Sequence, residues 1–331
     1  MTRYFARKIG LYLLAFWAGV TIDWAIPRLM PGNPIAAYVS RFSLNSQGPW
    51  TALYQLFNKA FGYNLPIWDQ YWHYWDNLFH GNLGISLYAF PEKVTTLIAQ
   101  AAPYTLALLV PAITLSYVLG NRVGAMAARR KALDNTVLPL GYLFQAMPYA
   151  WLALAAAFYL AQIERWFPVQ GGSAAGVAAG FTWVYIWGLV SHWFLPFLTV
   201  FLVSFGGWSI GMRNLVIYEL ETDYARYLRA LGAPSRLVRR YAYRNAVLPQ
   251  LSGLALALGT VIGGNIVTEV VFQYPGLGHL IYTAATDQDY SLLQGIFIFI
   301  IVGVLVANFL IDIVYILIDP RTRLSMQGAA A

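Results

Sequence analysis

Residues 223–232 of this chain read DYARYLRALG and lie in a polar segment between two long apolar stretches. Apolar side chains recur in this decapeptide at helical spacing, which predicts a short helix with one apolar stripe. The stripe consists of Tyr224, Leu228 and Leu231, while Arg226 and Arg229 lie away from it.

A turn and a second helix are expected after this stretch. Gly232 predicts the end of the first helix, because glycine readily adopts the left-handed conformation that closes a helix. Pro234 is well suited to the first turn of the next helix, and Leu248-Pro249 returns the chain to apolar sequence. That second helix carries four arginines: Arg236, Arg239, Arg240 and Arg244. We therefore expect two short helices joined at a glycine.

The composition of the whole chain is that of a membrane protein. Of its 331 residues, 59% are hydrophobic and 11% are charged, whereas a soluble domain is about a quarter charged. A membrane-spanning helix needs about 20 mainly apolar residues. Six segments meet this length: 8–30, 97–121, 134–162, 183–212, 246–271 and 293–318. The expected fold class is an all-α polytopic membrane protein with six transmembrane helices.

The placement of lysine and arginine predicts the orientation in the bilayer. With the N-terminus in the cytoplasm, 16 of the 21 basic residues fall in cytoplasmic segments. Positively charged loops are retained on the cytoplasmic side, so we expect both termini there and no nucleic-acid partner. A cleaved signal peptide is the alternative for the N-terminus, because Arg7 and Lys8 precede an apolar run. That run, however, continues through Trp24 and Ile26, which is long for a signal peptide.

The first outer loop, about residues 31–96, is too long to be a simple connection. Within it, residues 68–75 read WDQYWHYW, with rings recurring at helical spacing. This suits an amphipathic helix that lies in the outer membrane interface. Packing against the helix bundle explains the same rings equally well, and the two interpretations stay open.

The polar segment from Arg213 to Pro249 also has two interpretations. Its arginines could enforce topology and contact anionic lipid headgroups. Alternatively, a rigid projection between two membrane spans could dock into a groove of a partner. We favour docking, because attraction to lipid requires charge but no apolar stripe interrupted by glycine.

Together with residues 244–249 (RNAVLP), the stretch 223–232 resembles the EAA-type coupling loop of dipeptide, oligopeptide and nickel ABC importer permeases. Further stretches are similar to signatures of that family in the family's order: MPGNP at 30–34, GNLGIS at 81–86, YPGLG at 274–278 and the last helix with its exit, Asn308 to Arg321. Asn33 and Asn82 stand where the family usually has aspartate. Arg226, Tyr227 and Leu228 replace the small residues of its coupling motif. The resemblance covers nearly the whole chain.

The resemblance implies the transmembrane-domain fold of a type I ABC importer in the bacterial inner membrane. It also implies four kinds of partner: a homologous second permease, two cytoplasmic ATPases, an extracytoplasmic solute-binding protein and the lipid bilayer. ATP and magnesium would bind to the ATPases, and this chain would bind no cofactor or metal. The residues implied to couple to an ATPase are Asp223, Tyr224, Arg226, Leu228, Arg229, Ala230, Leu231, Gly232 and Ala233. The cargo stays open among peptides, nickel complexes and oligosaccharides.

The expected organisation has three parts. Residues 1–96 form the first transmembrane helix and the outer cap loop, 97–323 a five-helix permease core with the coupling loop at 213–249, and 324–331 a cytoplasmic tail. The chain is not expected to be an enzyme. None of its four lysines follows a glycine, so it lacks the Gly-Lys that a P-loop requires. No GxSG or HExxH motif of an intramembrane protease occurs either.

Three carboxylates fall within the predicted spans, where charge is costly and a function is the first hypothesis. Asp23 lies near a helix end and suits a structural role, and Asp312 shares a helix face with Asn308. Glu269 could line the translocation path or brace the turn that follows it. Their spread over different helices makes a weak proton relay. The main alternative function is an ion-coupled secondary transporter, and it leaves the coupling loop without a purpose.

Overall fold

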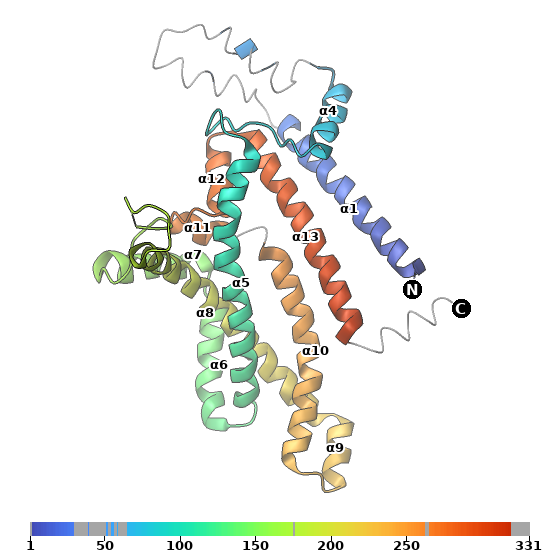
Figure 1. Ribbon diagram of the computed structural model, residues 1–331. Coiled ribbons are helices and arrows are strands. Elements are labelled where there is room, and N and C mark those ends of the chain that lie inside the picture. Colours follow the sequence, from blue (N-terminus) through green and yellow to red (C-terminus); the bar gives the residue numbers. More distant parts are fainter. Residues whose placement is uncertain are drawn as a thin grey trace. The chain divides into compact units, whose positions relative to one another are not determined.

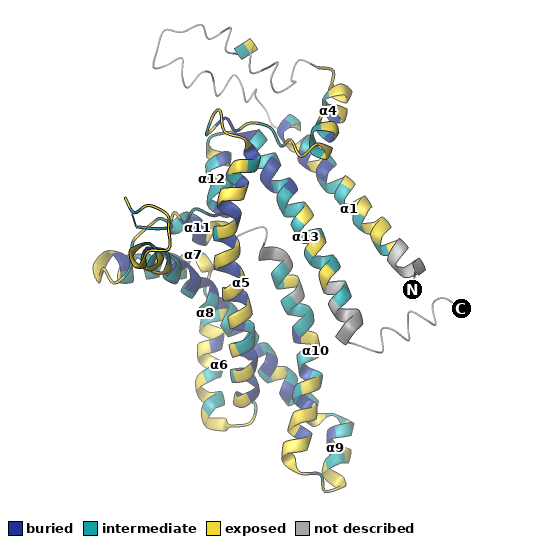
Figure 2. Cartoon of the chain, viewed as in Figure 1, coloured by how far each residue is buried: buried dark blue, intermediate teal, exposed yellow. Residues whose placement is uncertain are grey.

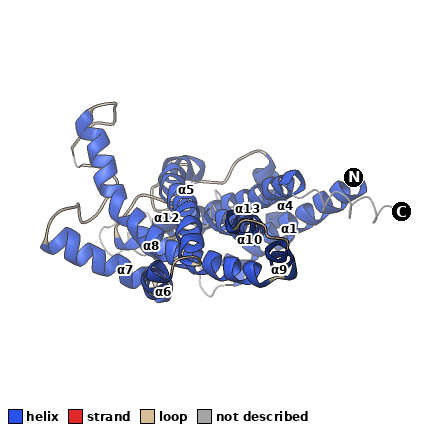
Figure 3. Ribbon diagram, turned by 90° about the horizontal axis from the view of Figure 1, so that it is seen from below, coloured by secondary structure: helices blue, strands red, loops and turns tan. Residues whose placement is uncertain are grey.

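The computed structural model describes residues 2–29, 39, 51, 54, 55, 58, 65–174, 176–261 and 265–318. Within these ranges the regular structure is helical, apart from one isolated antiparallel bridge between Ile85 and Lys93 (Figures 1 and 3). The prediction of an all-α protein is confirmed for this part of the chain. The PGNP stretch at 31–34 lies outside it.

The described residues form two units. The first extends to Pro103 and resumes at Leu277; its helices are α1 (Thr2–Leu29), α4 (Ile67–Phe79), the start of α5 (Val94–Ala127), α12 (Leu277–Thr286) and α13 (Tyr290–Ile318). The second extends from Tyr104 to Gly276; it holds the rest of α5, α6 (Lys131–Ala146), α7 (Tyr149–Ala156), the π-helix Ala157–Ile163, α8 (Trp183–Glu221), α9 (Asp223–Ala230), α10 (Ser235–Val261) and α11 (Ile266–Val271). The predicted boundaries at residues 96 and 323 stay a prediction.

In the first unit, α4 packs against α1 through its aromatic residues. Tyr71 and Trp75 are buried beside Val20, and the Tyr71 ring meets Trp24 edge to face. Trp68 and Trp72 of the same helix are exposed by 71% and 66%. Packing is therefore confirmed for Tyr71 and Trp75, and the interfacial role stays a prediction for Trp68 and Trp72.

In the second unit, α8 contacts α6, α7, α9, α10 and α11. Its contact with α5 depends on two glycines one turn apart. A Cβ at Gly120 would lie 2.7 Å from the Trp208 Cβ, and one at Gly124 would lie 2.1 Å from the Ser209 carbonyl oxygen. Small residues at i and i+4 let two membrane helices approach until their backbones touch.

Four described helices contain segments long and apolar enough to cross a membrane: α1, α5, α8 and α13. A fifth span results if α6 and the helix after it are taken together. The predicted segment 246–271 corresponds to the second half of α10 and to α11, and residues 262–264 between them are outside the described ranges. Six spans therefore stay a prediction.

The segment 134–162 is not the single helix that its hydrophobicity predicts. α6 ends at Ala146, and the chain bends by 98° before continuing as Tyr149–Ile163. Met147 is extended (φ −74°, ψ 125°) because it precedes Pro148, whose ring disfavours a helical conformation at the preceding residue. Proline also supplies no N–H to the helix. The prediction of one uninterrupted span was wrong here.

Candidate functional site

The predicted docking segment is a projection formed by the end of α8, α9 and the start of α10 (Figure 1). The turn after α9 is a Schellman motif. The Gly232 N–H donates to the Arg229 carbonyl, and the Ala233 N–H to the Leu228 carbonyl, both at 3.0 Å. Gly232 has a φ of +74°, which glycine adopts without strain. The predicted end of the helix at this glycine is confirmed.

The second helix of the projection differs from expectation. α10 is one helix of 27 residues from Ser235 to Val261, with Pro249 inside it. Proline removes one backbone hydrogen bond, but in membrane proteins neighbouring groups satisfy the freed carbonyl and helices continue through it. The expectation of a short helix is confirmed for α9 and wrong for the helix that follows.

The inner face of the projection is buried and tied together by one carboxylate. Ala225 on α9 and Val238 on α10 are exposed by 0% and 2%. The Glu219 Oε2 of α8 accepts hydrogen bonds from the Tyr224 hydroxyl (2.8 Å) and from Asn245 Nδ2 (3.3 Å). Burial and the bond to Glu219 raise the pKa of Tyr224, so its hydroxyl remains a donor at neutral pH. Glu219 thus links α8, α9 and α10.

The tip of the projection is exposed. Tyr227 and Leu231 are exposed by 66% and 65%, and Figure 2 shows exposed residues around the turn between α9 and α10. Large apolar side chains on an otherwise polar projection are typical of a surface that a partner covers. Tyr224 and Leu228 are half-buried, as the stripe predicts. Leu231, the third residue of the stripe, is exposed because it lies in the turn that leaves α9.

The two arginines of α9 make different contacts. The Arg226 Nη1 lies 3.8 Å from Asp223 Oδ1, and both side chains are exposed, so solvent screens this ion pair. Arg229 donates from Nη2 to the Leu220 carbonyl in the last turn of α8. A cation is favoured there by the helix dipole. Arg229 therefore helps to hold α9 against α8.

A basic pocket of about 300 Å³ lies beside the projection. Arg129, Arg229 and Arg239 line it, together with Ser235 at the start of α10. Burial and the charge of Arg239 lower the pKa of Arg129. The described lining includes no acidic residue, so an anionic group of a lipid or a partner suits this pocket.

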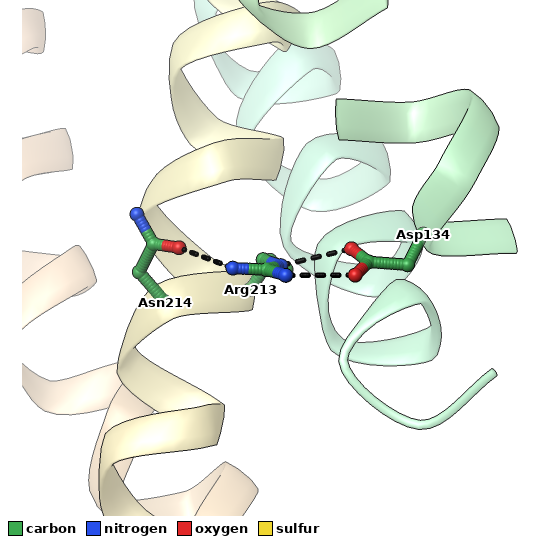
Figure 4. A network of polar contacts seen from close by, with 3 residues as sticks. All are labelled: Asp134, Arg213 and Asn214. Atoms are coloured by element: carbon green, nitrogen blue, oxygen red, sulfur yellow. Dashed lines mark hydrogen bonds and ion pairs between the residues drawn. The ribbon is translucent and has the colours of Figure 1, made fainter. Parts of the chain in front are cut away.

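Above the projection, α8 is fixed to α6 by a bidentate ion pair (Figure 4). Arg213 donates from Nε to Asp134 Oδ1 at 2.8 Å and from Nη2 to Oδ2 at 2.7 Å. Each side chain keeps 23% of its surface exposed. Two parallel hydrogen bonds fix direction as well as distance. They therefore hold α8 and α6 in one register at Arg213 and Asp134.

Glu269, on α11, is fully buried. The Thr105 hydroxyl donates to its Oε1 at 2.8 Å, and the Tyr274 N–H donates to its backbone carbonyl at 2.8 Å. A Cβ at Gly276 would lie 2.3 Å from Oε2, so only glycine fits beside the carboxylate. These are the contacts of a group that braces the turn from Phe272 to Gly276. A role for Glu269 in the translocation path stays a prediction.

Comparison with known proteins decides the family. The sequence profile of the "binding-protein-dependent transport system inner membrane component" matches residues 120–324, more than half of the chain, including the whole projection. The chain belongs to this family. It is a multi-pass permease subunit of an ABC importer in the bacterial inner membrane, and its helices fit that location.

Relatives of this permease match over almost its full length. It is 29% identical to a di/tripeptide transport system permease of Pseudomonas aeruginosa, over 98% of this chain and 99% of the relative. It is 30% identical to a putative peptide permease of Brucella suis, over 98% and 100%, and 27% identical to an oligopeptide transport system permease of Bacillus subtilis, over 97% and 99%. These relatives favour the importer over the ion-coupled transporter and agree with a subunit that is not itself an enzyme.

Several contacts of the permease were not expected from sequence. Glu219, Asn245 and the pair Arg213 with Asp134 are separated by up to 79 residues, and sequence spacing does not reveal such contacts. Asp289 is another: it is fully buried, and its Oδ2 accepts hydrogen bonds from the Ser86 hydroxyl (2.6 Å) and the Tyr88 N–H (2.9 Å). Ser86 is the last residue of the GNLGIS stretch, and this stretch was the sequence signal that could have drawn attention to the contact. Asp23 accepts a hydrogen bond from Tyr74 (2.7 Å), which suits a structural role.

Proposed function

We propose that this permease forms half of a translocation pathway for peptides and couples it to ATP hydrolysis on partner subunits. The peptide class is supported by the relatives, which are named for di/tripeptide, dipeptide and oligopeptide transport. Oligosaccharides and nickel complexes are the other cargoes that the resemblance allows. We choose peptides because the relatives that match this chain over almost its full length are named for peptide transport.

The projection that contains α9 carries this proposal. Its inner face is fixed by Glu219 and by the Schellman turn, whereas Tyr227 and Leu231 at its tip are exposed. A rigid element with an exposed apolar tip can receive a push from a partner and transmit it. In the proposed complex, residues Asp223 to Ala233 contact one ATPase, with Ala230, Leu231 and Gly232 at its groove.

The proposed complex contains a homologous second permease, two cytoplasmic ATPases and an extracytoplasmic solute-binding protein. The family description, which names a binding protein, supports the last of these. ATP and magnesium bind to the ATPases, and the permease binds no cofactor of its own. Closure of the ATPase pair moves both projections and switches the pathway between outward and inward access.

The proposed topology has six spans and both termini in the cytoplasm. α10 is the span that fails a simple test of length and apolarity, because its first half carries the arginines of the projection. A helix of 27 residues is about 40 Å long. It therefore has room for a basic cytoplasmic end and a membrane-embedded end in one element.

The test is uptake by the complete importer in proteoliposomes with a Leu231→Glu permease. Leu231 is exposed by 65%, so the substitution leaves the fold intact and places a charge at the docking tip. We expect uptake to fall at least tenfold, equivalent to about 1.4 kcal/mol of lost docking energy. Transport by the wild type should need ATP and survive a proton uncoupler.

Leu65→Glu serves as the matched control. Leu65 is exposed by 43% and precedes α4 on the predicted outer side, so its uptake should equal that of the wild type. Wild-type uptake by the Leu231→Glu complex would contradict the docking role. Uptake that an uncoupler abolishes would contradict the importer itself.

A further inference from the structure

A cavity of about 770 Å³ lies in the unit from Tyr104 to Gly276. This volume is in the range of roughly 300–1,000 Å³ that is usual for small-ligand sites. Its lining is mostly apolar, with six side chains that can form hydrogen bonds: Gln145, Tyr149, Ser204, Trp208, Gln250 and Asn265. The described lining includes no charged residue and no histidine. The cavity can therefore bind uncharged polar groups without attracting ions.

Gln250 is the most buried of these polar groups. It is exposed by 7%, and its side-chain amide forms no hydrogen bond with the described part of the chain. The amide lines the cavity, so its donors and its acceptor are available to whatever enters. A Cβ at Gly211 would lie 2.6 Å from Gln250 Nε2, so this glycine leaves the space that the amide occupies. The site holds the amide ready for a ligand that the chain itself does not provide.

We propose that this cavity is the chain's contribution to the solute route and that the Gln250 amide binds a peptide bond of the passing solute. The inference rests on the proposed function. A primary amide has a carbonyl acceptor and N–H donors, and a peptide bond has one donor and one acceptor. Because the N–H and C=O of a trans peptide bond point in opposite directions, the Gln250 amide can accept a hydrogen bond from the N–H or donate one to the C=O, which makes Gln250 a reader of the peptide backbone.

Other occupants suit the cavity less well. A bare nickel ion would favour imidazole ligands, and the described lining has none. A lipid chain or an apolar side chain of the second permease would leave the Gln250 amide without a partner. Because the described lining carries no charge, it does not select between acidic and basic side chains of a peptide.

The test compares trialanine with an analogue methylated on the backbone nitrogen of its middle residue, transported by the complete importer in proteoliposomes. Methylation removes the N–H that Gln250 would bind. The ratio of the two uptake rates defines the methylation penalty. We expect Gln250→Leu, which has similar volume and no polar atom, to reduce this penalty about fivefold. The receptor and ATPases are the same in both complexes, so their own preferences cancel between them.

Ser252→Ala is the control on the same helix. The Ser252 hydroxyl donates to the Leu248 carbonyl (3.3 Å) and does not line the cavity, so this variant should keep the wild-type penalty. Gln250→Met provides a second apolar variant if Gln250→Leu fails to insert. An unchanged penalty in the apolar variant would overturn the role of Gln250 while leaving the importer function intact. Wild-type uptake that does not depend on ATP would instead contradict the proposed function.

Discussion

Gly120 and Gly124 set the distance between α5 and α8. Each lies where a methyl group would overlap the neighbouring helix, with Gly124 almost in contact with the Ser209 carbonyl. Closer to the projection, Arg213 and Asp134 fix the contact of α8 with α6 through two short hydrogen bonds. Small residues and one ion pair thus determine how α8 is held, and α8 leads directly into the projection.

Gly124→Ala should therefore destabilise the permease. The added methyl group has backbone on the other side, so the helices must move apart, at a cost of about 3 kcal/mol. Thermal unfolding in detergent should show a clear drop in the midpoint. Gly10→Ala, in α1, is the control, since a Cβ there meets nothing within 4 Å. An unfolding midpoint for Gly124→Ala equal to that of Gly10→Ala would refute the close packing.

The projection formed around α9 is the element that sequence predicted best. Its stripe, its glycine and its arginines are all local signals, and local hydrogen bonds of the Schellman turn carry them into the structure. The predictions that failed depend on contacts between residues far apart in the sequence. The bend at Pro148 and the continuation of α10 through Pro249 use the same residue type with opposite results. The groups that surround each proline decide whether the helix bends or continues, and a single sequence does not show which groups these are.

The candidate site shows the same division. Sequence identified Leu231 and Gly232, but the buttress from Glu219 to Tyr224 and Asn245 depends on how α8 and α10 come together. Gln250 was not singled out, because one glutamine near the start of a predicted span is unremarkable until its burial is known. Chemistry that one helix carries was predictable, and chemistry assembled from several helices was not.

Gly232→Pro should uncouple ATP hydrolysis from uptake. Proline fixes φ near −65°, and Gly232 requires +74°, so the turn would be rebuilt and the tip misplaced while the spans still insert. ATPase activity and uptake, measured on the same proteoliposomes, should diverge. Gly232→Ala should cost only about 1 kcal/mol and retain coupling. Coupled uptake at the wild-type rate by the proline variant would show that the tip geometry is not needed.

At the scale of the whole molecule, orientation in the bilayer can be tested without removing any native thiol. The chain has no cysteine, so single cysteines report their own positions. We expect Lys131→Cys and Glu221→Cys, both at exposed positions, to react with a membrane-impermeant maleimide only from the cytoplasmic side. Lys93→Cys and Glu164→Cys, also exposed, should react only from outside.

One predicted span separates each labelled position from the next along the chain. The four results together therefore test the number of spans between residues 93 and 221. Labelling of Glu164→Cys from the cytoplasm would make the bent segment from α6 to Ile163 a re-entrant loop that enters and leaves on one side. In that case the positive-inside assignment of the remaining loops would fail as well, because the predicted sides alternate along the chain.

α8 has a mechanical consequence of its own. It is a single helix of 39 residues, about 58 Å long, with Thr222 and the projection at one end and Trp208 and Gly211 of the cavity wall along its side. If a partner pushes on the projection as proposed, α8 transmits that force to the cavity wall, because the helix is continuous from Gly211 to Glu221. Coupling between ATP hydrolysis on the partners and movement of the solute would then depend on the rotation of α8 about its own axis.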